Sequence, residues 1–319
     1  MPATGSATFS ALKTVGDSGF YQAFENCPKL TSVTFGSLES IGVSAFRSAF
    51  KNSGLATAIS NSWLSAVPAS AYQSAFEGSQ ITSVTFSAVN SIANNAFDSA
   101  FAGCTKLTSA SFPALVSSGG EGEGFDHAFA GCSALVSVDF SNLESVNGWL
   151  THDAFNGAWS GCTALKRIAF EKLYIVHGSG KFSYAFENCT ALEVADFSAL
   201  QTITTAYGYK NFEKPFMGCV ALRSVDFSSL ATVGGSDLLS NCFQGCEALT
   251  RLDFPALSSV AATSFTTMLS GSYVTEVHFP AAMQSTIQGL DGFDTCFGAG
   301  AGAVDFYFDL GLEEENDAE

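Results

Sequence analysis

Basic residues are scarce in this chain. Its 319 residues include 13 Lys and Arg against 30 Asp and Glu, which gives a formal net charge of −17 at pH 7. Proteins that follow nucleic-acid phosphates or bind anionic membranes need positive surface charge. The composition therefore argues against a nucleic-acid-binding protein and against a protein of anionic membrane surfaces. It is neutral towards protein, glycan or cation partners.

Long apolar runs are also absent. No stretch approaches the roughly 18 apolar residues of a transmembrane helix, so we expect no membrane insertion. The first residues, MPATGSATFSALKTV, contain no charged segment followed by an apolar one, so no signal peptide is visible. Either the protein is not secreted by that route, or its leader precedes Met1 and has been removed.

Motifs of catalysis and metal binding are missing as well. The chain has no GxSxG nucleophile elbow, no CxxC pair and no HExxH helix. The string GSGK at 178–181 lacks the first glycine and the Ser or Thr of a phosphate-binding loop. The four histidines are scattered along the chain, at His127, His152, His177 and His278. We therefore expect no enzyme, no cofactor and no metal site.

What the chain does contain is an internal repeat. The stretch from Phe20 to Ile41, FYQAFENCPKLTSVTFGSLESI, is rewritten towards the C-terminus with its apolar residues at fixed steps. Its Cys position recurs every 25 to 30 residues, at Cys27, Ser53, Ser79, Cys104, Cys132, Cys162, Cys189, Cys219, Cys246, Ser272 and Gly300. Such a period predicts a solenoid in which each repeat buries its apolar face on its neighbours. We expect one elongated domain over residues 1–308, beginning in the middle of a repeat.

Each repeat contains one clear strand pattern. In LTSVTF, Leu30 to Phe35, apolar and polar residues alternate, so Val33 and Phe35 should face inward while Ser32 and Thr34 face outward. The copies of this segment should stack into one long parallel sheet.

Each repeat also carries an aromatic pair four residues apart, such as Phe20 and Phe24. Side chains at i and i+4 share one face of a helix, so the pairs predict a helix of one to two turns on the convex side of each repeat. Helices this short would depend on docking against their neighbours. The total of 30 Phe residues indicates a large aromatic core.

The nine cysteines fall in packing positions of the repeat. Seven share the position of Cys27, while Cys242 and Cys296 take the position occupied elsewhere by Ala49. Equivalent positions of a solenoid stack about 5 Å apart with parallel side chains, which is not the geometry of a disulfide. We expect a column of reduced, buried thiols.

The unit AFxxCxxLxxVxFxxLxxI resembles the BspA-like (Treponema-type) leucine-rich repeat. It is present here as AFENCPKLTSVTFGSLESI and AFAGCSALVSVDFSNLESV, and the resemblance covers nearly the whole chain. The resemblance implies an α/β solenoid, a right-handed arc of about 11 repeats with a parallel concave sheet and short convex helices. It also implies surface-exposed binding or adhesion proteins of bacteria and some protists. The repeats are longer than the family's usual unit, and they also look like those of phage-encoded proteins of gut bacteria.

The first candidate site is a charged stripe on the concave sheet. The outward strand positions are small and neutral in the N-terminal half and charged in the C-terminal half, at Asp139, Arg167, Asp196, Asp226, Arg251, Asp253, Glu276 and His278. Stacked carboxylates repel one another unless cations or arginines intervene, which would raise the pKa of at least some of them. We interpret the stripe as a site for a partner or a cation. The alternative is a solvated sheet face whose charges are balanced by neighbouring arginines.

The second candidate site is a pair of loops lengthened by insertion. VNGWLTHDAF and ITTAYGYKNF carry the side chains Trp149, His152, Tyr207, Tyr209 and Lys210. Aromatic residues on such loops can stack on sugars or anchor a protein partner. Alternatively, they fold back and cover the edge of the solenoid.

The last segment, residues 309–319, breaks the repeat and is read as a solvated acidic tail. From these features the sequence predicts non-enzymatic recognition of a protein or glycan by a bacterial cell-surface or extracellular protein. The alternative is a structural or phage-associated protein, such as a virion-associated tail, receptor-binding or scaffold component.

Overall fold

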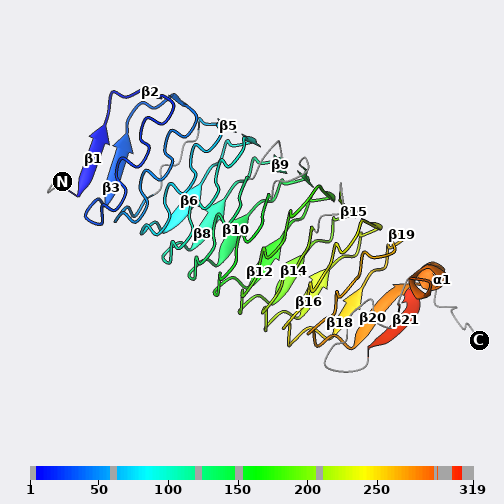
Figure 1. Cartoon of the computed structure of the whole chain (residues 1–319). Coiled ribbons are helices and arrows are strands. Elements are labelled where there is room, and N and C mark those ends of the chain that lie inside the picture. Colours follow the sequence, from blue (N-terminus) through cyan, green and yellow to red (C-terminus); the bar gives the residue numbers. More distant parts are fainter. Residues whose placement is uncertain are drawn as a thin grey trace, which may run out of the picture.

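The chain winds into an elongated β-solenoid with its termini at opposite ends (Figure 1). The computed structural model describes residues 5–57, 63–118, 124–147, 154–205, 211–290, 293 and 304–310. Over these ranges the solenoid has about ten turns built on parallel strands, against the 11 repeats expected. Successive turns lie side by side in sequence order along the whole body.

The SVTF-type segments form one side of the solenoid, as the alternation of polar and apolar residues predicts. In β6 the central Val84 is buried while Ser83 and Thr85 are exposed. We call the outward side of these strands the strand face. The strands are β1 (Ser6–Phe9), β3 (Ser32–Phe35), β6 (Ser83–Thr85), β8 (Ser109–Ser111), β10 (Ser137–Asp139), β12 (Arg167–Ala169), β14 (Val194–Asp196), β16 (Ser224–Asp226), β18 (Arg251–Asp253), β20 (Glu276–Pro280) and β21 (Asp305–Leu310).

The strand face is divided into several ladders, which corrects the expectation of one continuous sheet. The ladders are β1-β3, β6-β8-β10, β12-β14-β16 and β18-β20-β21. The break between β10 and β12 coincides with Trp159, which replaces phenylalanine in the core. The ring centroids of Phe140 and Phe170 lie 6.4 Å apart there, against 5.2 Å between Phe112 and Phe140. The strand-face rings are thus packed less closely at this break than one turn earlier.

A second side is formed by short strands in which the chain turns back. Strands β9 to β19 of this side form one six-stranded ladder. The strands of this side are β2 (Thr14–Val15), β4 (Ser40–Ile41), β5 (Ala66–Val67), β7 (Ser91–Ile92), β9 (Ser117–Ser118), β11 (Ser145–Val146), β13 (Ile175–His177), β15 (Thr202–Thr204), β17 (Thr232–Gly234) and β19 (Ser259–Val260).

The aromatic pairs lie on overlapping turns, which corrects the expectation of short helices. Between Gly16 and Cys27, every second amide donates to the carbonyl three residues earlier, as Ala23 does to Phe20 at 3.0 Å. The amides in between donate to the next turn of the solenoid, as Phe24 does to Ala49 at 2.8 Å. Positive φ angles recur at every fourth residue, at Ser18 (54°), Gln22 (54°) and Asn26 (56°). We call this segment and its counterparts in later turns the turn ribbon.

Spacing explains why the ribbon replaces helices. A helix with its side chains is about 10 Å wide, roughly twice the separation of stacked strands. A helix in every turn would therefore splay the repeats into an arc. The ribbon instead repeats at nearly strand spacing, since the rings of Phe46 and Tyr72 are 5.6 Å apart and those of Tyr72 and Phe97 are 5.5 Å apart. The ribbon thus repeats at a spacing close to that of paired strands, and the body runs nearly straight in Figure 1. The helical segments that lie wholly within the described residues are η1 (Ala281–Met283) and α1 (Gln284–Gln288), near the C-terminal end.

The core consists of stacked aromatic rings, as expected. Rings from the strands meet rings from the turn ribbon edge to face, as Phe112 and Phe125 do at 4.9 Å and 84°. The eight described cysteines are free, which confirms for them the expected reduced thiols, while Cys296 lies outside the described residues. Cys132 donates its thiol to the carbonyl of Phe101 in the preceding turn at 3.1 Å, and most other buried cysteines do likewise. Burial raises the pKa of Cys189 to about 12, so its thiol stays protonated.

The C-terminal end differs from the expected boundary. Strand β21 continues to Leu310, two residues beyond the expected end of the solenoid at 308, and residues 311–319 of the acidic tail lie outside the described part. Within the described residues, no helix has the length and apolar character needed to cross a membrane.

Candidate functional site

Four of the eight predicted stripe residues line one open groove on the strand face. The groove has a volume of about 390 Å³ and crosses strands β12, β14, β16 and β18. Its charged lining is Arg167, Asp196, Asp226 and Asp253, and its apolar lining is Val194, Val225, Phe227 and Pro255. Asp196 and Asp226 are register partners on adjacent parallel strands. The fold therefore brings together residues from four successive repeats.

Two of the groove's aspartates, Asp196 and Asp226, are positioned by the sequence Asp-Phe-Ser. In this motif one carboxylate oxygen accepts a hydrogen bond from the backbone amide of the serine two residues later, which is an Asx-turn. The bond is 3.1 Å from Ser198 to Asp196 and 2.8 Å from Ser228 to Asp226. The sequence pattern DFS could have predicted these turns. It leaves the second oxygen of each carboxylate available for another partner.

Two of the three groove aspartates are paired with arginine. Nη2 of Arg167 lies 2.6 Å from Oδ2 of Asp196. Arg251 contacts Asp253 on its own strand through Nε at 2.9 Å and Nη2 at 2.8 Å. Asp226 is exposed and has no ion-pair partner in the described part of the chain. The expected balance of charges by arginine therefore holds for Asp196 and Asp253 and leaves Asp226 unmatched.

Asp139 lies apart from the groove, on β10. Its carboxylate accepts hydrogen bonds from the Ser111 hydroxyl at 2.8 Å and from the Ser141 amide at 3.0 Å. Burial raises the pKa of Asp139, but these hydrogen bonds stabilise the charged form and hold the pKa below its usual value. The pKa of Asp139 therefore moves in the direction opposite to the one that repulsion between stacked carboxylates would give.

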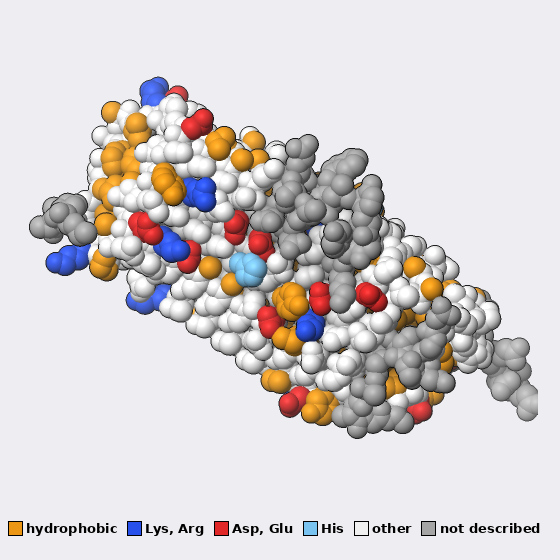
Figure 2. Space-filling model, in the orientation of Figure 1, with side chains coloured by type: hydrophobic (Ala, Val, Ile, Leu, Met, Phe, Trp, Pro, Cys, Tyr) orange, Lys and Arg blue, Asp and Glu red, His pale blue; other side chains and the backbone are white. Residues whose placement is uncertain are grey.

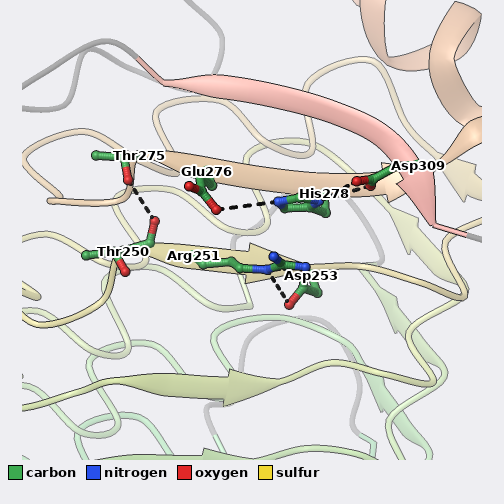
Figure 3. Close-up of polar contacts among 7 residues, drawn as sticks. All are labelled: Thr250, Arg251, Asp253, Thr275, Glu276, His278 and Asp309. Carbon is green, nitrogen blue, oxygen red and sulfur yellow. Dashed lines mark hydrogen bonds and ion pairs between the residues drawn. The ribbon is translucent and has the colours of Figure 1, made fainter.

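Glu276 and His278 occupy the C-terminal end of the stripe, and Figure 3 shows His278 between Glu276 and Asp309. Nδ1 of His278 lies 2.9 Å from the carboxylate of Asp309 on β21, and Nε2 lies 3.7 Å from that of Glu276. The imidazole stacks on Tyr307 with centroids 4.5 Å apart. His278 is only 5% exposed, so it is held by the last strand instead of standing on the open face as predicted.

The match to a known repeat covers most of the chain. The model of the BspA type leucine rich repeat region matches in six copies, over residues 20–148, 98–267 and 183–290. The chain belongs to this family. The matched residues include every strand that lines the groove, from β12 to β18.

Solved structures similar to this BspA-type chain include three bacterial proteins. A leucine-rich repeat protein from Bacteroides ovatus is 20% identical, with 95% of this chain and 83% of that chain covered and a TM-score of 0.42. A leucine rich cell surface protein from Faecalibacterium prausnitzii is 15% identical, with 96% and 88% covered and a TM-score of 0.30. The pneumococcal vaccine antigen PcpA is 12% identical, with 86% and 62% covered and a TM-score of 0.34. No match was found among curated proteins.

The loop residues predicted as a second binding site of this BspA-type protein lie outside the described residues. They are Trp149, His152, Tyr207, Tyr209 and Lys210. The base of the second insertion is described: Asn211 is fully buried and donates its side-chain amide to the Thr204 carbonyl at 2.7 Å. This bond joins the two ends of the second insertion. The loop residues themselves stay a predicted contact region.

Charges elsewhere on the BspA-type solenoid are paired or scattered. Figure 2 shows one side of the molecule, where acidic and basic side chains stand singly or in small groups along its length. On the turn ribbon, Lys51 pairs with Glu77 at 2.8 Å and Arg47 lies 5.8 Å from the ring centre of Tyr21. Lys51 and Arg47 thus each contact a side chain of a neighbouring turn. The groove therefore stays the main candidate for recognition.

Proposed function

We propose that this BspA-type protein recognises another macromolecule, a protein or a glycan, through the strand-face groove and without catalysis. The main support is the environment of Asp226. This exposed carboxylate has no ion-pair partner among the described residues and lies in an open groove lined by charged and apolar side chains. Arg167, Asp196 and Asp253 frame it from the neighbouring strands. A net charge of −17 disfavours nucleic acid as the partner.

We place the protein at the bacterial cell surface or outside the cell. Membership of the BspA-type family supports this location, because the family resemblance implies surface-exposed binding proteins. Antibody labelling of intact cells tests it: labelling without permeabilisation supports the location, and labelling only after permeabilisation contradicts it.

The inserted loops are proposed as a second contact region. Trp149, Tyr207 and Tyr209 would stack on a sugar or anchor a protein partner beside the groove. Replacing each with Ala should weaken binding to the partner and leave the melting temperature nearly unchanged. A large drop in melting temperature would instead assign these rings to the edge of the core.

A structural or phage-associated role is the second candidate. The nearly straight body, with an evenly stacked turn ribbon, suits a rigid spacer within an assembly. Neighbouring genes for virion tail components would favour this role, whereas a leader sequence upstream of Met1 would favour the surface protein. In the spacer role, variants at Asp226 would leave assembly unchanged.

A further inference from the structure

The groove is centred on an interruption between β16 and β18. Where the ladder is intact, the amide after the strand donates to the next turn, as Phe197 does to the Asp226 carbonyl at 3.1 Å. Within the described residues, the Phe227 amide makes no such bond to β18, and the two strands belong to separate ladders. Val225 accordingly keeps 8% exposure, whereas Ala195 and Leu252 at equivalent positions keep 0% and 2%. The interruption gives the groove an aliphatic floor that solvent reaches.

The charge of the groove is unbalanced at one point. Three aspartates line it, and Arg167 and Arg251 compensate two of them, which leaves a net charge of −1. That charge belongs to Asp226, whose Oδ1 accepts the Ser228 amide and whose Oδ2 has no partner in the described part of the chain. The free oxygen lies in the same groove as the floor at Val225.

We propose that the groove receives one lysine or arginine side chain of a protein partner, with its aliphatic stem on Val225 and Pro255 and its charge at Asp226. This inference rests on the proposed function and narrows the partner from a protein or a glycan to a protein. Long cationic side chains cover apolar surface with their stems while the charged end stays hydrated. Charge complementarity of this kind also fixes the register of a protein interface.

The groove fits a cationic side chain better than it fits a sugar. The hydroxyls of a neutral sugar would leave the charge of Asp226 uncompensated. Sugars also stack on aromatic faces, whereas Phe227 is only 1% exposed and the accessible apolar lining is aliphatic. A volume of about 390 Å³ lies at the small end of ligand pockets, which span about 300–1,000 Å³.

The test titrates the full chain with N-acetyl-glycyl-lysyl-glycine amide, with its arginyl counterpart and with the norleucyl peptide, which keeps the stem without the charge. The Ser228 backbone amide, followed by nitrogen–proton correlation spectra, reports on Asp226 because it donates to that carboxylate. We expect a saturable shift of this signal with at least one cationic peptide, with a dissociation constant on the order of millimolar. The norleucyl peptide should leave the signal unchanged.

Asp226→Asn should raise the dissociation constant of the cationic peptide at least about threefold, in line with the loss of one partly exposed charged contact. The amide oxygen of Asn can still accept the Ser228 amide, so the turn is preserved. Glu247→Gln, which removes an exposed carboxylate outside the groove, should bind as the wild type does. Equal shifts with the norleucyl peptide, or no shift with either cationic peptide, would overturn the inference. So would a response to calcium chloride alone.

The outcome for the cationic side chain is separable from the outcome for the proposed function. If the peptides fail but a glycan partner is lost in Asp226→Asn, the recognition site stands and the inferred partner class is wrong. If the peptides bind at Asp226 and the screen yields a protein partner lost in the same variant, both are supported.

Discussion

At the scale of single residues, an aspartate followed by Phe-Ser does two things. It holds the turn after its strand, as the Ser198 and Ser228 amides show by bonding to Asp196 and Asp226. It also leaves one carboxylate oxygen for a neighbour, which is a serine for Asp139 and an arginine for Asp196. Asp226 is the member of this set whose second oxygen has no partner among the described residues. The same motif therefore supports the fold at two positions and offers a contact at the third.

Asp139 should make stability depend on pH. Its pKa in the folded protein is held below the ordinary 3.8, so its contribution is fully present above that value and is lost as pH falls through the lower folded value. Asp139→Asn should therefore be less stable than the wild type at pH 7, and the difference should shrink at about pH 2, below the ordinary pKa of 3.8. Urea unfolding at both pH values measures it. A difference that is the same at both pH values would show that the charge of Asp139 does not matter.

At the scale of elements, the turn ribbon carries the largest departure from expectation. Aromatic residues four apart share a face in a helix, and they share one equally in a ribbon of overlapping turns with a four-residue period. The aromatic spacing alone could not separate the two. The deciding factor is the distance between turns, because strands and ribbon both repeat at about 5 Å and helices do not.

Ser48 has a φ of 52°, so the relative stabilities of its Gly and Ala variants distinguish the ribbon from a helix. Left-handed backbone costs a residue with a Cβ about 1–2 kcal/mol, and glycine escapes this cost. Ser48→Gly should therefore be more stable than Ser48→Ala by about 1 kcal/mol in chemical unfolding. In a helix the order would be reversed by about the same amount. Finding the alanine variant more stable would refute the ribbon at this position.

The last strand, β21, should depend on Asp309. The hydrogen bond from His278 holds the pKa of Asp309 below its usual value, so this contact stabilises the Asp309 carboxylate. Asp309→Ala should increase amide hydrogen exchange in β21 severalfold and leave β14 unchanged. Asp305→Ala, which removes an exposed charge from the same strand without touching His278, is the matched control. Equal effects of both variants would mean that net charge, and not this contact, retains the strand.

At the scale of the whole molecule, the period of the sequence predicted the solenoid, the stacked strands and the aromatic core. It did so because a residue repeated every 25 to 30 positions must meet its own copies in space. The reduced thiols followed from the same geometry and are confirmed for the eight described cysteines.

The groove was only partly predictable. Alternation along the strands placed Arg167, Asp196, Asp226 and Asp253 on one face, and the structure brings these four together. The interruption between β16 and β18 lies between two turns, and no local sequence pattern marks it. The burial of His278 was missed because β21, which covers it, lies where the repeat pattern fades. The binding roles of the groove and of the loops stay predictions.

The most direct test of recognition at the strand face is a binding screen of the purified protein on a glycan array and on matrix proteins, with and without calcium. We predict a saturable partner whose binding is reduced in Asp226→Asn and retained in Glu247→Gln, with the melting temperature unchanged in both variants. A partner that binds the Asp226 variant as tightly as the wild type would place recognition elsewhere. No partner in either panel would contradict recognition and favour the spacer role.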